Sequence, residues 1–316
     1  MLLIVPYSGY ARVDFEKYDK GLKRKASGIM AEAGATIKEA KQQADEVIEE
    51  VAGYPWVERI ARFGYATKGV VYMVVGALAT LAATGMGGET TDTRGALQTI
   101  EQQPFGKFAL GTVAFGLIGY VLWRWIQAIA DTDDKGSGLK GISVRIGYAC
   151  SGLVYAGLAF TAAKILIDVG EPDSSNEVQQ HWTARLMSVP YGRWLVGIVG
   201  ASVIIFGLYQ MYKGLWAKFR KRLKLGQMSF SKKVWATLLG RTGYAARGVV
   251  FCIVGNFLIQ AALHYDASEA KGLEGVLDTL AQKPYGGWVM GIVAAGLIAY
   301  GIYMLVESRY RRIAGS

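Results

Sequence analysis

Six long apolar stretches constrain the fold of this chain more than any other feature. They lie at about residues 63–83, 106–130, 146–167, 192–216, 242–264 and 286–307. Each is close to the roughly 20 mostly apolar residues that a helix needs to cross a bilayer. Apolar residues occur around the whole helical circumference, whereas a surface helix of a soluble protein carries them on one face. The sequence therefore predicts an all-α membrane protein with six transmembrane helices.

Two motifs alternate along these stretches. The odd stretches share Arg-x-Gly-Tyr-Ala-x-x-Gly, which starts at Arg62, Arg145 and Arg241. The even stretches share Pro-[Phe/Tyr]-Gly-x-[Phe/Trp]-x-x-Gly, which starts at Pro104, Pro190 and Pro284. The two motifs start 42, 45 and 43 residues apart in the three copies. Two motifs at matched spacing indicate three tandem two-helix repeats.

The repeats divide the chain into an N-terminal arm and three membrane segments. The arm is 1–55, and the membrane repeats are 56–131, 132–217 and 218–316, the last with a basic linker and the C-terminal tail. Because each repeat holds two spans, all three repeats enter the membrane the same way round. Their symmetry axis then runs along the membrane normal. We therefore expect a ring of three hairpins with pseudo-threefold symmetry.

The composition is typical of closely packed membrane helices. Charged residues make up 19% of the chain, below the roughly 25% of soluble domains. Glycine accounts for 41 of the 316 residues. Small residues let helix backbones approach closely in a bilayer, so we interpret the motif glycines as packing residues.

The two alternating motifs resemble those of the bacterial membrane family filed as domain of unknown function 1206. The resemblance covers about 57–307, nearly all of the chain except the arm, and it implies three two-helix units. The family brings no established activity, so the resemblance implies no catalytic residue. This chain departs from the repeat pattern at two positions. Ser151 replaces the basic residue of the other two repeats, and Ser202 replaces a glycine, Gly116 or Gly296.

The loops between the stretches alternate in charge. The fourth and fifth stretches are joined by a strongly basic linker, and the linker between the second and third and the C-terminal tail are also basic. The other three loops are acidic or mixed. Lys and Arg favour the cytoplasmic side, which predicts a multi-pass protein of the bacterial cytoplasmic (inner) membrane with both termini cytoplasmic. The net charge of +10 then reflects topology and contact with anionic lipid head groups, and we expect no nucleic-acid partner.

Six positions at the predicted cytoplasmic ends of the odd stretches are candidates for binding an anion or a lipid head group. They are Arg62, Lys68, Arg145, Ser151, Arg241 and Arg247. The motif arginines fit simple anchoring to lipid phosphate. Lys68 and Arg247 lie six residues further in, or roughly 9 Å deeper. They either snorkel back to the interface or, with Ser151, surround the axis as a basic constriction.

Three further polar residues fall within the spans. Arg124, between Trp123 and Trp125, is interpreted as an interfacial residue that snorkels. Asn256 and Gln260, one turn apart, are predicted to make intramembrane polar contacts in the form of interhelical hydrogen bonds.

The residue types that usually carry catalysis or bind metals do not form a recognisable site in this sequence. The two histidines, His181 and His264, fall in or beside outer loops. Cys150 and Cys252 lie in apolar runs without metal-ligand spacing. No glycine-rich phosphate loop or Ser-His-Asp arrangement is present. We therefore predict no catalytic residue, no metal and no cofactor, and we do not expect an enzyme.

Apolar residues in the N-terminal arm recur about every 3.6 positions over 22–51, which predicts an amphipathic cytoplasmic helix. The apolar stripe is thin and rich in alanine, and the polar face carries both signs of charge. A helix on a membrane surface usually has larger apolar residues and more positive charge. Packing against another helix and a mostly solvated helix are the remaining alternatives.

Two classes of function fit these observations. The first is an accessory or scaffolding protein that binds a partner membrane complex, through the arm, or lipid. The second is a channel or transporter for a small anion or lipid-like solute along the pseudo-threefold axis. The orientation of Lys68 and Arg247, toward the axis or toward lipid, distinguishes the two.

Overall fold

The computed structural model describes residues 54–86, 90–133, 136, 138–169 and 174–313, together with 28–30, 32–36, 39 and 43. The chain forms two units, Met1–Glu50 and Val51–Ser316. In the first unit the described residues are helical and exposed. Most of the amphipathic helix predicted at 22–51, and with it the surface predicted to bind a partner, lies outside the described residues.

Six long helices make up most of the second unit. They are α2 (Pro55–Thr84), α4 (Gly106–Ile129), α5 (Leu139–Leu166), α7 (Gly192–Leu215), α8 (Phe230–His264) and α10 (Gly286–Tyr310). Each is long and apolar enough to cross a membrane. The shortest has 24 residues, or about 36 Å, against a hydrocarbon core of roughly 30 Å. The chain is therefore an all-α multi-pass membrane protein, as predicted.

The even helices begin at the glycines predicted from the sequence, whereas the odd helices begin earlier than predicted. Helix α8 starts at Phe230 and not near 242, and α5 starts at Leu139 and not near 146. The additional turns mix charged and apolar residues, so a search for continuous apolar stretches does not detect them. They extend the odd helices beyond the apolar core.

Each repeat also contains a short helix that the sequence did not reveal. These helices are α3 (Thr93–Glu101), α6 (Ser175–Met187) and α9 (Leu273–Ala281), and a 3-10 turn, η3 (Ala267–Glu269), precedes the last. Helix α3 is capped by Asp92, whose side chain accepts hydrogen bonds from two backbone amides, and α6 by a capping box of Ser174 and Glu177. A repeat is therefore two spans joined through a short helix.

The Pro-aromatic-Gly motif makes the turn from the short helix into the even span. The aromatic residue has a positive φ in all three copies: 61° at Phe105, 63° at Tyr191 and 61° at Tyr285. The span begins at the glycine that follows. A Cβ at Gly106 would lie 1.8 Å from the Glu101 carbonyl oxygen, so the turn admits only glycine there. The proline thus precedes this turn and does not stand in the first turn of the span.

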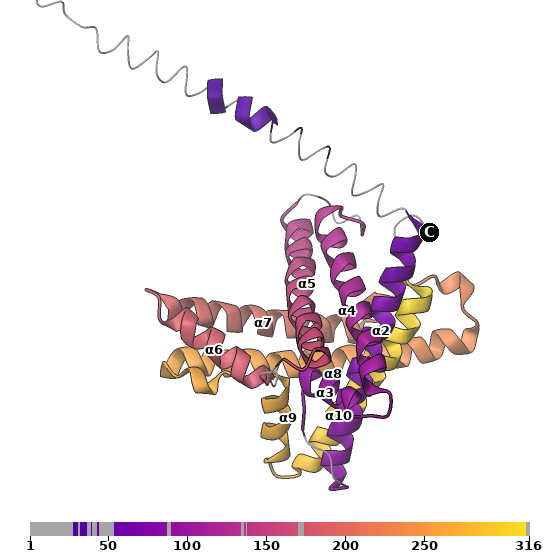
Figure 1. Cartoon of the computed structure of the whole chain (residues 1–316), viewed down its shortest axis with the longest axis vertical. Helices are drawn as coiled ribbons and strands as arrows, with labels where there is room; N and C mark the ends of the chain where they lie inside the picture. Colours follow the sequence, from indigo (N-terminus) through magenta and orange to yellow (C-terminus); the bar gives the residue numbers. More distant parts are fainter. Residues whose placement is uncertain are drawn as a thin grey trace, which may run out of the picture. The chain divides into compact units, whose positions relative to one another are not determined.

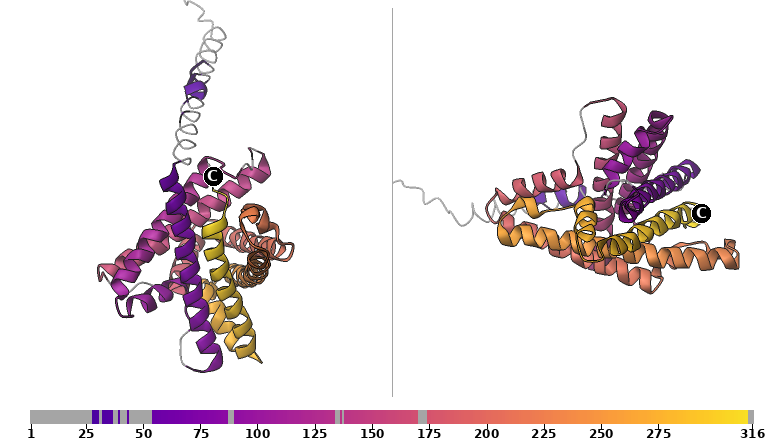
Figure 2. Two further views of the ribbon diagram at one scale, coloured as in Figure 1. Left: turned by 90° about the vertical axis from the view of Figure 1, so that its right-hand side faces the viewer. Right: turned by 90° about the horizontal axis from the view of Figure 1, so that it is seen from below.

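The long helices pack as three pairs, each joining an even span to the odd span of another repeat. The pairs are α4 with α5, α7 with α8, and α10 with α2. In two pairs glycines face each other: a Cβ on Gly69 would lie 2.7 Å from the Gly301 oxygen, and one on Gly248 2.7 Å from the Gly207 oxygen. Backbones therefore touch, as expected for glycine-rich membrane helices. Figures 1 and 2 show that α7 and α8 cross α2 and α10 at a steep angle.

Contacts within repeats 1 and 3 connect the pairs into a ring of three pairs that is open within repeat 2. Helix α2 packs on α4 and α8 packs on α10, but α5 and α7 are hardly in contact. We call the side where α2, α5 and α8 begin the basic side, and the side that carries the short helices the far side. The contacts follow the predicted order of the repeats, but the ring is interrupted between α5 and α7, and the α7–α8 pair lies across α2 and α10 (Figures 1 and 2).

The linker between α7 and α8 folds against the basic side. It contains two 3-10 turns, η1 (Lys218–Arg222) and η2 (Leu225–Gln227). Phe219 is buried beside Gly240 and stacks on Tyr244 with ring centroids 5.4 Å apart. Leu223 forms a β-bridge with Arg311 of the C-terminal tail. Linker and tail together hold Arg222 and Arg311 at the end of the bundle.

Candidate functional site

A cavity of about 450 Å³ lies inside the ring at its basic side and is lined by side chains from all six long helices. We call it the central cavity. Seven basic residues line it: Lys68, Arg124, Lys140, Lys213, Arg222, Arg247 and Arg311. The acidic residue of the lining is Glu307. Such a surplus of positive charge inside a membrane protein is costly unless it serves a site.

The repeated odd-span motif supplies one tyrosine per repeat to the central cavity. These tyrosines are Tyr65, Tyr148 and Tyr244, and all three line it. On α2 the tyrosine is three residues before Lys68, so the two side chains lie on one helix face. The motif therefore contains residues that face the cavity as well as glycines at helix contacts.

Lys68 and Arg247 face this cavity and are not extended toward lipid. Their exposed fractions are 2% and 9%. The Lys68 ammonium donates a hydrogen bond to the Tyr120 hydroxyl at 3.0 Å, and the Arg247 guanidinium donates one to the Tyr300 hydroxyl at 2.6 Å. The two hydrogen bonds are pseudosymmetric, because each joins the same positions in repeats 1 and 3.

Aromatic rings surround both cations. The Lys68 nitrogen lies 4.6 Å from the Tyr155 ring centroid and 4.8 Å from that of Tyr120. The Arg247 guanidinium carbon lies 4.6 Å from the Tyr300 centroid and 5.0 Å from that of Phe251. Cation–π contacts of this kind stabilise a desolvated charge by up to about 2 kcal/mol. They do not neutralise it.

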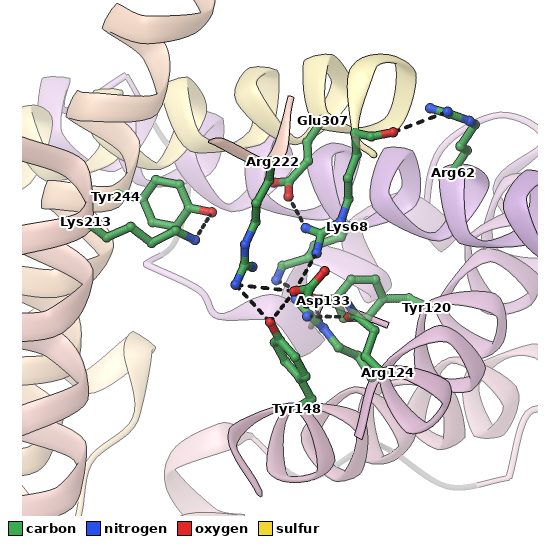
Figure 3. A network of polar contacts seen from close by, with 12 residues as sticks. Arg62, Lys68, Tyr120, Arg124, Asp133, Tyr148, Lys213, Arg222, Tyr244 and Glu307 are labelled. Carbon is green, nitrogen blue, oxygen red and sulfur yellow. Dashed lines mark hydrogen bonds and ion pairs between the residues drawn. The ribbon is translucent and has the colours of Figure 1, made fainter. Parts of the chain in front are cut away.

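The ends of the even helices contribute a second set of polar groups (Figure 3). Arg124 donates to Tyr120 and to Gln127, the latter at 2.8 Å. Lys213 donates to the Tyr244 hydroxyl at 2.8 Å. Arg124 is thus half-buried beside the cavity, whereas its tryptophan neighbours had suggested an interfacial residue.

Two acidic residues offset part of the positive charge. Glu307 pairs with Arg311, and Asp133 lies 3.4 Å from Arg222 and 3.7 Å from Arg311. Burial by itself lowers the pKa of Arg311, but Tyr65, Glu307, Asp133 and Tyr148 together outweigh burial, so that this pKa lies well above its usual value. The guanidinium therefore stays charged, and basic groups still outnumber acidic ones around the cavity.

Several buried polar atoms at the cavity lack a hydrogen-bond partner among the described residues. Among the residues that line it, they are Nε of Arg247, Nε and Nη2 of Arg311 and the hydroxyl of Tyr65, and none of these atoms has appreciable exposed surface. A buried donor without a partner costs roughly 1–3 kcal/mol, and native proteins keep few of them. A ligand with several acceptor oxygens would offset the surplus charge of the lining, and it would reach these donors once the side chains around them shift.

Repeat 2 differs from the other repeats at the cavity. Ser151 stands where the others have Lys68 and Arg247, and Phe206 stands where they have Tyr120 and Tyr300. Both members of the cation–tyrosine pair are thus replaced. Ser151 and Phe206 still line the cavity, so repeat 2 contributes to its wall a small hydroxyl and an aromatic ring.

The motif arginines of the odd spans lie elsewhere. Arg62 donates to the carbonyl oxygens of Ser308 and Arg309, both at 2.7 Å, where α10 ends; Figure 3 shows it apart from the cluster. Arg145 donates to the Ala128 carbonyl oxygen at 2.7 Å, where α4 ends. Arg241 is exposed. Two of the three therefore satisfy the free carbonyls of a helix C-terminus, and none of the three lines the central cavity.

Asn256 and Gln260 do not belong to this site either. Both lie on the exposed face of α8, and neither forms a side-chain hydrogen bond within the described part of the chain. They therefore do not connect helices of this chain to each other. Their polar side chains face outward from the ring.

Sequence reasoning missed the polar groups of the even helices, although the repeats contain a signal for them. Gln127, Lys213 and Glu307 each lie 23 residues after the motif proline. A polar residue at the same place in all three apolar spans indicates an equivalent, inward-facing position. An alignment of the three repeats with one another would have found these three residues.

Aromatic residues close the cavity toward the far side. Tyr72 and Tyr155 are buried, with hydroxyl oxygens 3.5 Å apart. The Tyr72 ring packs edge-on to Tyr300 at 5.0 Å, and the Tyr155 ring packs edge-on to Tyr120 at 4.7 Å. The central cavity therefore ends at a layer of tyrosine rings.

Comparison with known proteins agrees with the repeat architecture. The family described as Domain of Unknown Function (DUF1206) matches residues 63–131, 146–217 and 242–311. The uncharacterized protein YxxB of Bacillus subtilis (strain 168) is 37% identical over 259 residues, which cover 82% of this chain and 93% of the relative. No solved structure matches the chain. With all three repeats matched, the chain belongs to the DUF1206 family.

Proposed function

We propose that this protein binds a phosphate-type anion, such as a lipid head group, in the central cavity, and that its role is binding and not catalysis. One observation carries the proposal. A cavity lined by aromatic and basic side chains carries a surplus of positive charge, and two of its cations, Lys68 and Arg247, are buried. An anion with several oxygens would supply the missing negative charge.

The alternative, that these cations only stabilise the fold, is weaker on energetic grounds. Buried charges rarely add stability even when they are paired, because desolvation offsets the attraction. Apolar residues of similar size at Lys68 and Arg247 would fill the same space without that cost. Retaining two buried cations around one cavity is therefore better explained by a ligand.

The charge of the loops supports a cytoplasmic location for the cavity mouth. The basic side carries the linkers and tail that are rich in Lys and Arg, which supports a cytoplasmic location for this side and for both termini under the positive-inside rule. We propose the bacterial cytoplasmic membrane as the site of action. The cytoplasmic leaflet of membranes carries anionic lipid, so the proposed ligand class is available there.

The experiment is a titration of the purified protein with phosphatidylglycerol, followed by native mass spectrometry. The variant K68M/R247M removes both buried cations, and R241M removes one exposed charge from the same helix as Arg247. A hydrogen bond to a charged group contributes roughly 1.5–3 kcal/mol, and 1.4 kcal/mol is tenfold in affinity. We expect the double variant to bind at least tenfold more weakly and R241M to bind like the wild type. Equal binding by all three proteins would contradict the proposal.

Conduction of anions along the axis is the alternative function. The layer formed by Tyr72, Tyr155 and their aromatic neighbours favours binding over conduction, because an ion would have to displace several packed rings. We expect no chloride or phosphate flux in liposomes that contain the protein, above the level of empty liposomes. A flux that K68M/R247M abolishes would make the channel the better proposal.

A scaffolding role through residues 1–55 remains a separate prediction from the sequence. It requires a membrane complex that binds the full chain and releases it when the arm is removed. Affinity purification of both forms in mild detergent tests this. Identical, partner-free preparations would count against it.

A further inference from the structure

We infer that the ligand is an anionic membrane lipid that reaches the central cavity sideways, between α5 and α7, and rests its acyl chains in that opening. The inference deepens the proposed function and rests on it. We call the opening the α5–α7 slit; its walls include Gly147, Ser151 and Val154 on α5 and Phe206 and Gln210 on α7. Three independent comparisons among the repeats support it.

The first comparison concerns the glycine that precedes the motif tyrosine. A Cβ on Gly64 would lie 2.6 Å from the Tyr120 backbone, and one on Gly243 would lie 2.5 Å from the Tyr300 backbone. The two spans of repeats 1 and 3 therefore touch at this level. In repeat 2 the same position, Gly147, has nothing within 4 Å. The contact that closes the other repeats is absent.

The second comparison concerns the next inward position on the odd spans. Val71, Val154 and Val250 stand three residues after Lys68, Ser151 and Arg247, respectively. Their exposed fractions are 0%, 71% and 6%. On the facing even helices, Tyr120 and Tyr300 are buried, whereas Phe206 is exposed. The helix faces that are covered in repeats 1 and 3 are open in repeat 2.

The third comparison concerns the even-span glycine that repeat 2 lacks. A Cβ on Gly116 would lie 1.9 Å from the Thr67 hydroxyl, and one on Gly296 would lie 2.3 Å from the Ala246 side chain. Ser202 takes this place on α7 and is exposed. Glycine is needed only where the two spans touch, so its replacement by serine agrees with the open slit.

A second hollow lies further along α5, beyond the layer of tyrosine rings that ends the central cavity. That hollow, of about 620 Å³, lies between α5, α6 and the start of α3. Most of its lining is apolar, including Leu153, Val154, Leu158, Val178 and Trp182, and Asp92, Arg94 and Gln179 add polar groups. Gly147, Ser151, Val154 and Leu158 form one stripe along α5. The stripe spans 11 residues, or about 16 Å, roughly half of a 30 Å hydrocarbon core. Its length thus matches one leaflet.

Charge and polarity along this path select the occupant. The basic end offers Lys68, Arg247 and the other cations of the central cavity to a head group, and the far end offers apolar side chains. A soluble anion would make no use of the apolar end. A neutral lipid would make no use of the cations. An anionic lipid fits both, with its head group in the central cavity and its chains in the slit.

The test narrows the slit without altering a closed interface. Gly147→Trp places a large side chain where a Cβ meets open space, and Gly111→Trp, on α4 outside the cavity lining, is the matched control because its Cβ also meets nothing within 4 Å. Val154→Trp, at the exposed position further along the stripe, is a second blocking variant. Three probes are titrated by native mass spectrometry: phosphatidylglycerol, phosphatidylcholine with the same chains, and soluble glycerol 3-phosphate.

We expect the wild type and G111W to bind phosphatidylglycerol at least tenfold more tightly than either other probe. G147W and V154W should weaken phosphatidylglycerol binding at least tenfold and leave glycerol 3-phosphate binding unchanged. Full-strength phosphatidylglycerol binding by both blocked variants would overturn the lateral route. If glycerol 3-phosphate binds as tightly as phosphatidylglycerol, the proposal that the ligand is a lipid is contradicted, whereas the proposal of an anion site is supported. Failure of both anionic probes to bind the wild type would overturn the anion site as well.

Discussion

Repeat 2 and its two neighbours carry the same motifs, yet their spans meet differently. In repeats 1 and 3 the two long helices touch at glycine, and a buried cation donates to a buried tyrosine beside that contact. In repeat 2 the glycine faces open space, and neither the cation nor the tyrosine is present. The same two-helix repeat thus has spans that touch in repeats 1 and 3 and spans that are separated in repeat 2. At this interface repeat 2 differs from the other repeats by Ser151, Ser202 and Phe206.

The change with the largest expected effect tests whether the glycine contact closes repeats 1 and 3. Gly64→Leu would force the side chain into the Tyr120 backbone, which cannot move without displacing α4. Overpacking of this kind costs about 3 kcal/mol, so we expect a clear drop in Tm in detergent. Gly147→Leu, the same substitution in repeat 2, should change stability by less than about 0.5 kcal/mol. Equal losses in both variants would mean that α5 and α7 are closed in solution.

A smaller effect is expected from removing the tyrosine hydroxyl of a closed repeat. Tyr300→Phe takes away the hydrogen-bond acceptor of Arg247, whose Nε already lacks a partner. The expected cost is roughly 2 kcal/mol, since hydrogen bonds to charged groups contribute roughly 1.5–3 kcal/mol. Phe206→Tyr makes the reverse change in repeat 2, where the ring is exposed, and should leave Tm unchanged. A stable Y300F protein would show that the pair does not hold repeat 3 together.

A still smaller effect distinguishes the two faces of the odd spans. Val71→Ala removes two carbons from a fully buried position, and a loss of about 1.6 kcal/mol is expected from transfer free energies near 0.8 kcal/mol per CH₂. Val154→Ala does the same at an exposed position and should have no measurable effect on Tm. Thermal unfolding followed by intrinsic fluorescence measures both. A larger loss for V154A than for V71A would contradict the assignment of the open face.

The smallest expected effect comes from rebuilding the pair that repeat 2 lacks. The double variant S151K/F206Y copies the residues of repeat 1 into repeat 2 and adds one more cation to the cavity. If the pair draws α5 and α7 together, phosphatidylglycerol binding should slow several-fold with little change in Tm. The single variant S151K, which adds the charge without its acceptor, is the control. Faster lipid binding by the double variant than by S151K would show that the pair does not close the slit.

Sequence alone determined the architecture of this protein. Apolar length gave six spans, and two motifs at matched spacing gave three repeats, because the bilayer thickness and the packing of small residues act on short stretches of chain. The motif Pro-aromatic-Gly was also visible in the sequence as part of the repeat. Its role as a turn with the aromatic residue at positive φ was visible only in the fold.

Tertiary structure decided the location of the site. It showed that Lys68, Ser151 and Arg247 share one cavity, that Arg62 and Arg145 satisfy the carbonyls at helix ends, and that Lys213 and Glu307 belong to the site. The sequence could not separate inward from outward residues, because spans apolar all round carry almost no amphipathic signal. It marked Ser151 and Ser202 as departures from the repeat. Only the lack of contact between α5 and α7 shows that these departures lie along an opening. Contact between two helices depends on both partners, so neither helix sequence reveals it alone.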